Sequence, residues 1–225
     1  MAFAPGFHSL AAADYRELVA GGTVLEADRH GDKLIALRDG RYLKLFRRRR
    51  LLSSALIRPY ARRFHANALA LSARGVPTVA PERLLRIPHL RRTAVVYRPL
   101  AGKTLRDRLR ATGERSALVQ QLGTFLAGLH RCGVCFRALH FGNVIVTEDG
   151  GFGLIDVADL ELRRRPLAPR QILRNLGHLM RYAEDWALVL ADAAAFRAGY
   201  EAAGGVLPAA LLAQLDVGAT DSLAC

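Results

Sequence analysis

The sequence predicts an α+β chain of two lobes, a small antiparallel-sheet N-lobe followed by a mostly helical C-lobe. Short runs with strand character alternate with turns between residues 23 and 46, a pattern typical of an antiparallel meander. Residues 117–130 instead carry apolar side chains at helical spacing, and a hairpin signal around Asp149-Gly150-Gly151 falls later in the same half. We expect the N-lobe to cover residues 1–97 and the C-lobe residues 98–225.

Composition indicates a folded domain with a sizeable core. The chain has 225 residues, of which 51% are hydrophobic, and no apolar run approaches the ~18 residues of a membrane span. The N-terminal stretch MAFAPGFHSLAAADY lacks a basic region followed by a long apolar run, so we expect no signal peptide. Cys132 and Cys135 form a CxxC without a second pair, which does not favour zinc and fits a reducing cytosol.

The chain is strongly basic, with a formal charge of +13 from 33 basic and 20 acidic residues. Such a charge predicts an acidic partner: a phosphorylated sugar, anionic lipid headgroups, a nucleotide or nucleic acid. The runs Arg47–Arg50 and Arg163–Arg165 could form an anion-binding rim or a solvated face, and a high-GC genome would also raise the arginine content. Aromatic content is 7%, which argues against nucleic acid because stacking platforms are not evident.

The N-lobe begins with a lead-in helix in residues 1–20 and continues with strands. We expect these strands at Thr23–Ala27, Lys33–Leu37 and Tyr42–Phe46. In the third strand, Leu43 and Leu45 face one way and Lys44 the other. A buried lysine is costly without an anion, so Lys44 either holds phosphates, as the third-strand lysine of kinases does, or snorkels from a sheet edge.

The rest of the N-lobe supplies weaker nucleotide signals. The turn before the second strand has a single glycine, Gly31, and no GxGxxG; it could close over a nucleotide, but nothing requires this. A helix is expected at Pro59–Arg74, with Asn67 positioned to hydrogen-bond Lys44. Val76–Leu85 returns to the sheet.

A buried strand and a hinge end the N-lobe. The strand is expected at Ala94–Tyr97, and Arg98–Gly102 reads as a hinge whose backbone could pair with an adenine edge.

In the C-lobe we expect a helix from Thr104, capped by Asp107, and a long core helix at Ala117–His130. An amphipathic helix is expected at Gln171–Trp186. The tail from Gly204 should form a short helix and a loose end.

The sequence indicates that the chain is organised around residues 135–159. Two apolar runs flank the Asp-Gly turn, and the resulting hairpin should set Asn143, before one strand, near Asp156, after the other. Two oxygen ligands on rigid strands suit a hard cation such as Mg²⁺. The spacing is that of a kinase catalytic loop followed by its metal-binding aspartate, except that Ala138 occupies the position of the base Asp, five residues before Asn143.

Several segments between about Gly22 and Tyr182 carry motifs of a known family. They are Tyr42–Arg47, Arg63–Asn67 with Gly75–Pro77, Tyr97–Gly102, Phe136–Asn143, Leu154–Asp156, and Arg174–Leu176 with Arg181–Tyr182. In these segments the chain resembles the lipopolysaccharide core kinases, the Kdo and heptose kinase group of Gram-negative bacteria. It is most similar to a small branch of toluene-tolerance-like proteins.

The resemblance implies a two-lobed protein-kinase-like fold with ATP in the cleft. It implies that Lys44 contacts the phosphates and that Asn143 and Asp156 hold Mg²⁺. Gly31, Asn67 and Tyr97 complete the residues expected to bind nucleotide. The acceptor would be a hydroxyl of an anionic core sugar, at the cytoplasmic face of the inner membrane.

The chain departs from the family pattern at three places. These are Ala138 for the base Asp, Asn67 for the helix Glu, and Asp156-Val157-Ala158 for Asp-Phe-Gly. One hypothesis is a sugar kinase that tolerates Ala138, with His140 or a substrate group standing in; His140 could equally brace the loop. The alternative is a pseudokinase that binds nucleotide or a partner without phosphotransfer.

Overall fold

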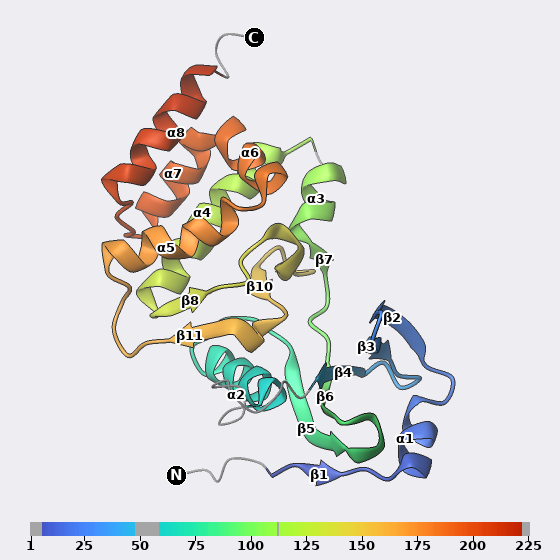
Figure 1. The fold of residues 1–225 in the computed structure, drawn as a ribbon. Helices are drawn as coiled ribbons and strands as arrows, with labels where there is room; N and C mark the ends of the chain where they lie inside the picture. Colours follow the sequence, from blue (N-terminus) through green and yellow to red (C-terminus); the bar gives the residue numbers. More distant parts are fainter. Residues whose placement is uncertain (1–5, 48–58, 112, 222–225) are drawn as a thin grey trace. The chain divides into compact units, whose positions relative to one another are not determined.

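The computed structural model describes residues 6–47, 59–111 and 113–221. It divides into two compact units, Met1–Leu100 and Ala101–Cys225, which Figure 1 colours from blue to green and from green to red. The sequence predicts a boundary between residues 97 and 98. Each unit is described by itself.

The first unit is built on a six-stranded sheet with the order β1-β5-β6-β4-β3-β2 (Figure 1). Its strands are β1 (His8–Ser9), β2 (Thr23–Asp28), β3 (Gly31–Ala36), β4 (Tyr42–Arg47), β5 (Ala80–Ile87) and β6 (Arg92–Arg98). The expected meander is confirmed as the antiparallel set β2, β3 and β4. The expectation of a single lead-in helix is wrong in part: β1 precedes α1 (Ala12–Val19) and pairs with β5 in parallel, a long-range pairing that no local pattern signals.

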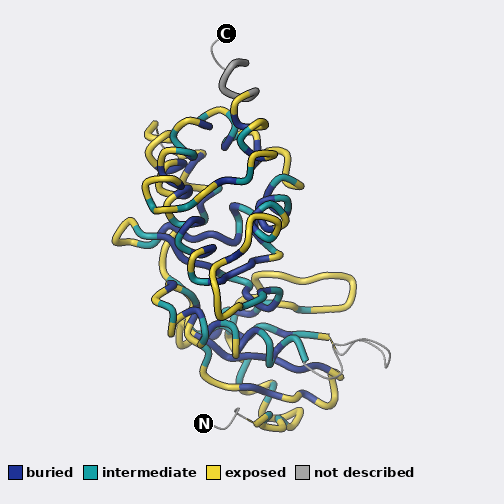
Figure 2. The backbone as a smooth tube through the Cα atoms, turned by 90° about the vertical axis from the view of Figure 1, so that its left-hand side faces the viewer, coloured by how far each residue is buried: buried dark blue, intermediate teal, exposed yellow. Residues whose placement is uncertain are grey.

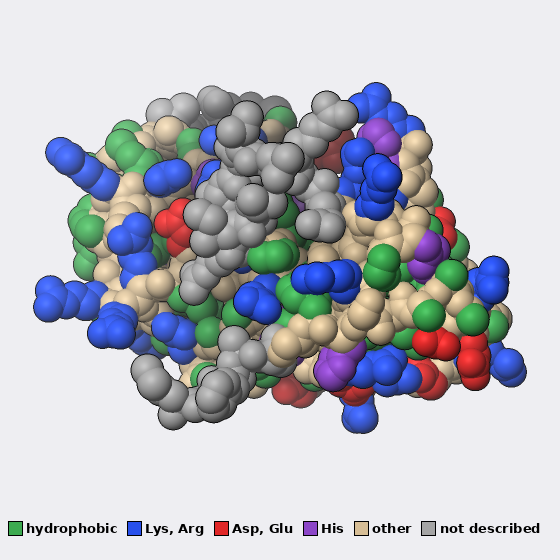
Figure 3. Space-filling model, turned by 60° about the horizontal axis from the view of Figure 1, so that its bottom comes forward, with side chains coloured by type: hydrophobic (Ala, Val, Ile, Leu, Met, Phe, Trp, Pro, Cys, Tyr) green, Lys and Arg blue, Asp and Glu red, His purple; other side chains and the backbone are tan. Residues whose placement is uncertain are grey.

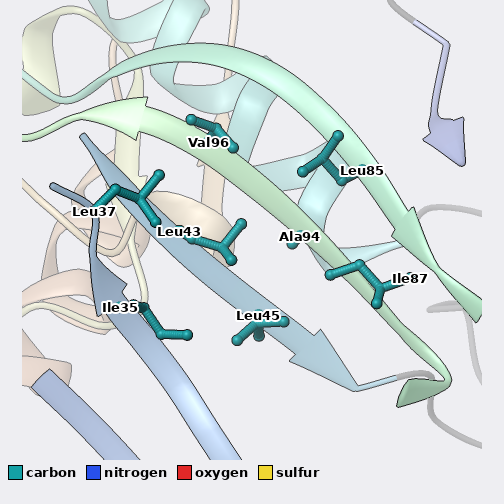
Figure 4. Packing of buried hydrophobic residues seen from close by; sticks show 8 residues of the cluster. All are labelled: Ile35, Leu37, Leu43, Leu45, Leu85, Ile87, Ala94 and Val96. Carbon is teal, nitrogen blue, oxygen red and sulfur yellow. The ribbon is translucent and has the colours of Figure 1, made fainter. Parts of the chain in front are cut away.

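Helices cover both faces of this sheet. On one face, eight buried apolar side chains form a core cluster on β3, β4, β5 and β6 and the residue after β3 (Figure 4). Leu10, Tyr15, Leu18 and Val19, on and beside α1, pack against it. On the other face, Phe64 of α2 (Tyr60–Ser72) lies with its ring 5.9 Å from Phe46 and 5.2 Å from Tyr97. Because side chains alternate along a strand, the face under α2 is also the face of Lys44.

The second unit is mostly helical, as predicted, with small antiparallel sheets. Its helices are α3 (Leu105–Ala111), α4 (Arg115–Arg131), α5 (Pro169–Leu179), α6 (Ala183–Ala191), α7 (Ala193–Ala202) and α8 (Ala209–Asp221). Its strands are β7 (Lys103–Thr104), β8 (Val134–Phe136), β9 (Val144–Val146), β10 (Phe152–Leu154) and β11 (Leu160–Leu162). β9 lies between β10 and β7, and β11 pairs with β8. The capping of α3 is confirmed: the Asp107 amide donates to Thr104 Oγ1 at 3.1 Å.

The single helix expected at Gln171–Trp186 is wrong. The structure has two helices, α5 and α6, separated by a turn in which the Tyr182 amide donates to the carbonyl of Leu179 at 2.9 Å. Tyr182 has φ −97° and ψ 86°, outside the helical region, at the start of α6. The break frees Tyr182 and Asp185 to contact another part of the unit, as described below.

Two glycines let α4 and α7 pack closely. A Cβ on Gly123 would lie 2.2 Å from the carbonyl oxygen of Phe196, and one on Gly199 would lie 1.9 Å from that of Gln120. Thr124 Oγ1 donates to the carbonyl of Gly199 at 3.1 Å across the contact.

In Figure 2 the buried residues, in dark blue, lie mostly on the strands and helices. Among the described residues, no helix is both long and apolar enough to cross a membrane.

Candidate active site

The β9–β10 hairpin brings two predicted ligands to one end. The strands pair antiparallel with Val144 opposite Leu154, and the amide of Ile155 donates to the carbonyl of Asn143 at 3.0 Å. Asn143 directly precedes β9, and Asp156 directly follows Ile155. The predicted hairpin is therefore confirmed, and both residues lie at its base.

The turn at the far end of the hairpin has the predicted Asp-Gly-Gly chemistry. Gly150 has φ +81°, a left-handed conformation that glycine adopts without a steric cost. Asp149 Oδ1 accepts a hydrogen bond from the Gly151 amide at 3.2 Å, and Thr147 closes the turn by donating to the Gly151 carbonyl at 2.9 Å. This local chemistry fixes the register of the hairpin.

Asn143 is held by the loop that precedes it. Its side chain is buried, and its Nδ2 donates to the carbonyl of Ala138 at 2.9 Å. Its own amide donates to the carbonyl of His140 at 2.9 Å. Because the amide nitrogen of the side chain is engaged in this way, the orientation of the side-chain oxygen is fixed, and that oxygen could act as a metal ligand.

Asp156 has an unusual backbone. Its φ of 54° and ψ of 44° place it in the left-handed region. Among the described non-glycine residues, Arg91 also has a positive φ. Aspartate is one of the residues that tolerate this conformation, and such conformations cluster at functional sites. Asp156 is half-buried, and the chain leaves the strand direction at this residue, at the base of the hairpin.

The donor set fits magnesium better than a tightly held transition metal. Among the described residues, no group of three His, Cys, Asp or Glu side chains could hold a metal ion. An amide oxygen and a carboxylate are nevertheless suitable for Mg²⁺, which keeps several waters and binds through one or two carboxylates together with substrate phosphates. Asn143 and Asp156 could hold such an ion only as a partial site that a nucleotide completes.

His140 braces the loop through its ring. Its Nδ1 accepts a hydrogen bond from the Gly142 amide at 3.1 Å, and its ring lies 4.6 Å from the ring of Tyr182. Burial lowers the pKa of His140 and the charge of Arg106 lowers it further, against a smaller opposite effect of Asp185 and Asp156. The ring is therefore neutral at pH 7. With Nδ1 as an acceptor, its proton resides on Nε2.

Asp185 of α6 anchors the same loop. The residue is 1% exposed, and its carboxylate accepts a hydrogen bond from the Phe141 amide at 2.7 Å. Arg106 of α3 donates to both oxygens of this carboxylate, at 3.0 and 2.8 Å, and the contact raises the pKa of the guanidinium. Neither residue was predicted from the sequence as part of the site. No local sequence signal identifies Asp185, because the exposed Glu184 directly precedes it in the same helix.

A buried polar network holds the strand that enters the loop. Asn175 of α5 donates to the carbonyl of Phe136 at 2.7 Å and accepts from its amide at 3.3 Å. His130 Nε2 lies 3.2 Å from Asn175 Oδ1, and His130 Nδ1 lies 2.6 Å from the hydroxyl of Tyr200. Burial lowers the pKa of His130 to about 4, partly offset by Asn175. A neutral ring satisfies both neighbours: Tyr200 donates to Nδ1 and Nε2–H donates to Asn175.

In the first unit, Lys44 lies in the middle of β4. It pairs with Leu34 of β3 and Val95 of β6, and it is half-buried between the buried Leu43 and Leu45. The predicted alternation of this strand is confirmed by these burial values. Lys44 thus lies in the interior of the sheet, on the face that α2 covers.

Asn67 and Tyr97 lie on the same side of that sheet. Asn67 is half-buried on α2, one turn after Phe64. Tyr97 is 6% exposed, with its ring 5.8 Å from Tyr42 and 5.2 Å from Phe64. The Tyr97 ring is thus packed into the unit, and its contribution to a ligand site would come through the backbone.

Gly31 lies apart from these residues, in the β2–β3 turn. It has φ +101°. The turn is held by Arg92, whose guanidinium donates to the carbonyl of Asp32 at 2.8 Å and to the carbonyl of His30. A buried arginine thus fixes this turn.

One comparison with known proteins decides the family. The sequence model of the lipopolysaccharide kinase (Kdo/WaaP) family matches residues 10–200. The chain belongs to this family. No curated protein matches it. The mixed architecture, a sheet unit followed by a mostly helical unit, is the two-lobed kinase-like fold that the sequence predicted.

Many basic side chains of this Kdo/WaaP family member are exposed. On the face shown in Figure 3, Lys and Arg side chains are distributed across the described surface. The predicted run Arg47–Arg50 lies outside the described residues except for Arg47, which is exposed at the end of β4. Arg163–Arg165 is exposed after β11, and Arg163 pairs with Glu161 at 3.6 Å.

Proposed function

We propose that this chain is an ATP- and Mg²⁺-dependent kinase that phosphorylates a sugar hydroxyl of the lipopolysaccharide core or a related envelope glycan. Family membership supports a lipopolysaccharide kinase. The main support for the proposed nucleotide and Mg²⁺ site is the hairpin, which brings Asn143 and the left-handed Asp156 to one end. Within the family, the motifs support the toluene-tolerance-like branch.

Each proposed role follows from a residue's position. Asn143 and Asp156 would hold Mg²⁺, which supplies charge neutralisation on the phosphates when bound. Lys44 is proposed to contact nucleotide phosphates, with Asn67 orienting the lysine. Gly31 and the backbone at Tyr97 are proposed to contribute to nucleotide binding.

Ala138 is compatible with catalysis. Phosphoryl transfer passes through a loose transition state, in which positioning and charge stabilisation provide most of the acceleration. A general base adds about 10²–10⁴-fold, so its absence slows the reaction without abolishing it. We propose that His140 braces the loop rather than replacing the base, because its Nδ1 is occupied by the Gly142 amide and its Nε2 carries the proton.

The location follows from the acceptor. A lipopolysaccharide precursor is anchored in a membrane, so we propose that the protein works in the cytoplasm and contacts the inner membrane peripherally. Its net charge of +13 supports contact with a polyanionic acceptor and anionic lipid.

Ala138 also favours a second candidate, a pseudokinase that binds nucleotide or a partner without transferring phosphate. This candidate shares the nucleotide site and differs in turnover. Nucleotide binding and phosphate transfer must therefore be measured separately.

Calorimetric titration with ATP, with and without Mg²⁺, tests the nucleotide site. We expect Mg²⁺-dependent binding that is weakened roughly tenfold or more in Lys44→Ala and in Asp156→Asn, because each removes a charge-assisted contact. Lys33→Ala is the matched control, since Lys33 is exposed on β3 and pairs with Asp28 at 3.4 Å. Absence of binding at millimolar nucleotide, or equal binding by all four proteins, would refute the site.

A further inference from the structure

A cluster of arginines adjoins the catalytic loop within the second unit. Arg137 is exposed and directly precedes Ala138, and its amide donates to the carbonyl of Asp159 at 3.1 Å. Arg174 precedes Asn175, whose side chain binds both backbone groups of Phe136. The two arginines therefore lie next to two residues, Phe136 and Asn175, that are hydrogen-bonded to each other.

α5 carries the cluster onward along one face. Arg174 and His178 lie four residues apart on α5, a spacing that places two side chains on one side of a helix. Arg181 is exposed just after the helix and adjoins Tyr182, whose ring contacts His140. The cluster thus reaches the loop at two points, through Arg137 and through Tyr182.

The charges of the cluster act on common neighbours. Burial lowers the pKa of His178, and Arg181, Arg137 and Arg174 lower it further, with Glu161 acting in the opposite direction. Burial and the charge of Glu161 raise the pKa of Cys135, while Arg174, Arg163 and Arg137 act in the opposite direction. Two buried groups on different elements, β8 and α5, thus experience the same arginines.

The positive charge of the cluster is only partly compensated. Glu161 pairs with Arg137 at 3.9 Å and with Arg163 at 3.6 Å, and all three side chains are exposed. Within the described part of the chain, Arg174 and Arg181 make no ion pair with an acidic side chain. Beneath them, His178 is 7% exposed and its Nε2 makes no hydrogen bond to the described residues. Such an arrangement indicates a site that receives an anion.

We propose that Arg137, Arg174 and Arg181 form the subsite that binds the anionic group, a carboxylate or a phosphate, of the acceptor sugar. The proposal rests on the proposed function, because it assigns the acceptor side of the same reaction. Its position beside Ala138 and His140 would fix an acidic sugar with a hydroxyl near the loop. Tyr182, 42% exposed between Arg181 and the loop, offers an apolar ring surface for the sugar itself.

Binding of small sugars tests the subsite without any turnover. The probes are free Kdo, which has a carboxylate, inorganic phosphate, and methyl mannoside as a neutral control; the readout is the NMR signal of the His178 ring. We expect Kdo or phosphate, but not methyl mannoside, to shift this signal. Arg137→Gln, Arg174→Gln and Arg181→Gln should each weaken binding roughly threefold or more, and Arg174→Gln/Arg181→Gln together roughly tenfold.

Two controls separate the subsite from the rest of the chemistry. Arg197→Gln removes the same charge from α7, where Arg197 pairs with Glu201 at 2.9 Å, and should bind Kdo or phosphate like the wild type. Asp156→Asn should also retain this binding while losing Mg²⁺-dependent ATP binding. Retained sugar-acid binding without phosphate transfer would refute the proposed function and leave the subsite standing.

Several results would overturn the subsite. One is a wild-type protein that binds neither Kdo nor phosphate, and another is a response to methyl mannoside equal to that to Kdo. A third is equal affinity in Arg197→Gln and the three cluster variants. Phosphate transfer with an unchanged KM for the acceptor in these variants would also overturn the subsite while supporting the proposed function.

Discussion

The buried carboxylate of Asp185 accepts a 2.7 Å hydrogen bond from the backbone amide of Phe141, 44 residues earlier in the chain. Through this contact α6 holds the loop that contains Ala138, His140 and Asn143. Arg106 completes the arrangement by neutralising the carboxylate. The loop is therefore fixed by a residue that no local sequence motif identifies.

Removing the charge of Asp185 should destabilise the protein. Asp185→Asn leaves Arg106 without its partner and weakens the bond to Phe141, so we expect a loss of about 2–3 kcal/mol in the free energy of unfolding. Urea unfolding followed by circular dichroism measures it. Glu184→Gln is the matched control, since Glu184 is 86% exposed and pairs weakly with Arg110 at 3.8 Å. Equal stability of the two variants would contradict the anchoring role.

The stability of the protein should fall in mild acid because of His130. The unfolded His130 takes up a proton as the pH falls through its ordinary pKa of 6.5, whereas the folded one does so only near 4. Between about pH 7.5 and about pH 5, this difference should cost about 2 kcal/mol of stability.

Comparison with His130→Gln isolates this contribution. The other buried histidines titrate in both proteins, so the variant should lose less stability on acidification than the wild type. Urea unfolding at both pH values gives the difference. Parallel pH dependence in the two proteins would show that His130 is not the group responsible.

The close crossing of α4 and α7 should not tolerate a methyl group. Gly199→Ala would place a Cβ 1.9 Å from the carbonyl oxygen of Gln120, so the helices must separate, at a cost of about 2–3 kcal/mol. Gly128→Ala on α4 meets nothing within 4 Å and should change stability by less than about 1 kcal/mol, in the stabilising direction. Thermal unfolding of both variants tests the difference, and a stable Gly199→Ala protein would contradict the close packing.

His140→Gln distinguishes a brace from a base. A glutamine oxygen can still accept a hydrogen bond from the Gly142 amide, so we expect kcat to fall by less than about tenfold, whereas loss of a general base costs about 10²–10⁴-fold. The pH profile of kcat provides an independent readout. Disappearance of a rising limb near neutral pH in His140→Gln would identify His140 as the base after all.

The elements that the sequence predicted correctly depend on local chemistry. The β9–β10 hairpin follows from a β-branched run before Asp149-Gly150-Gly151 and an apolar run after it, and the alternation of β4 follows from its own residues. The missed features are long-range. The parallel pairing of β1 with β5 and the contact of Asp185 with Phe141 join segments far apart in the chain. The break between α5 and α6 interrupts a sequence pattern that is amphipathic throughout. After this break, Tyr182 and Asp185 contact the loop.

The candidate site residues also divide into those that local sequence predicts and those that depend on long-range contacts. Asn143 and Asp156 were predictable together because a hairpin brings the residues that flank it to one end. Asn175 was noticed as a family motif, but its hydrogen bonds to Phe136 and His130 could not be derived from spacing. The shared face of Arg174 and His178 is visible in the sequence once the limits of α5 are known, whereas Arg181 lies after the end of that helix.

The most direct test of the account is transfer of radiolabelled phosphate from ATP to dephosphorylated lipopolysaccharide core. The account predicts Mg²⁺-dependent incorporation by the wild type and by Asp149→Asn, a matched change at the exposed tip of the same hairpin. Asp156→Asn should lose incorporation by at least about 10²-fold, because the ligand at the base of the hairpin is removed. No incorporation by the wild type, or equal incorporation by Asp156→Asn, would contradict the assignment of this chain as a kinase.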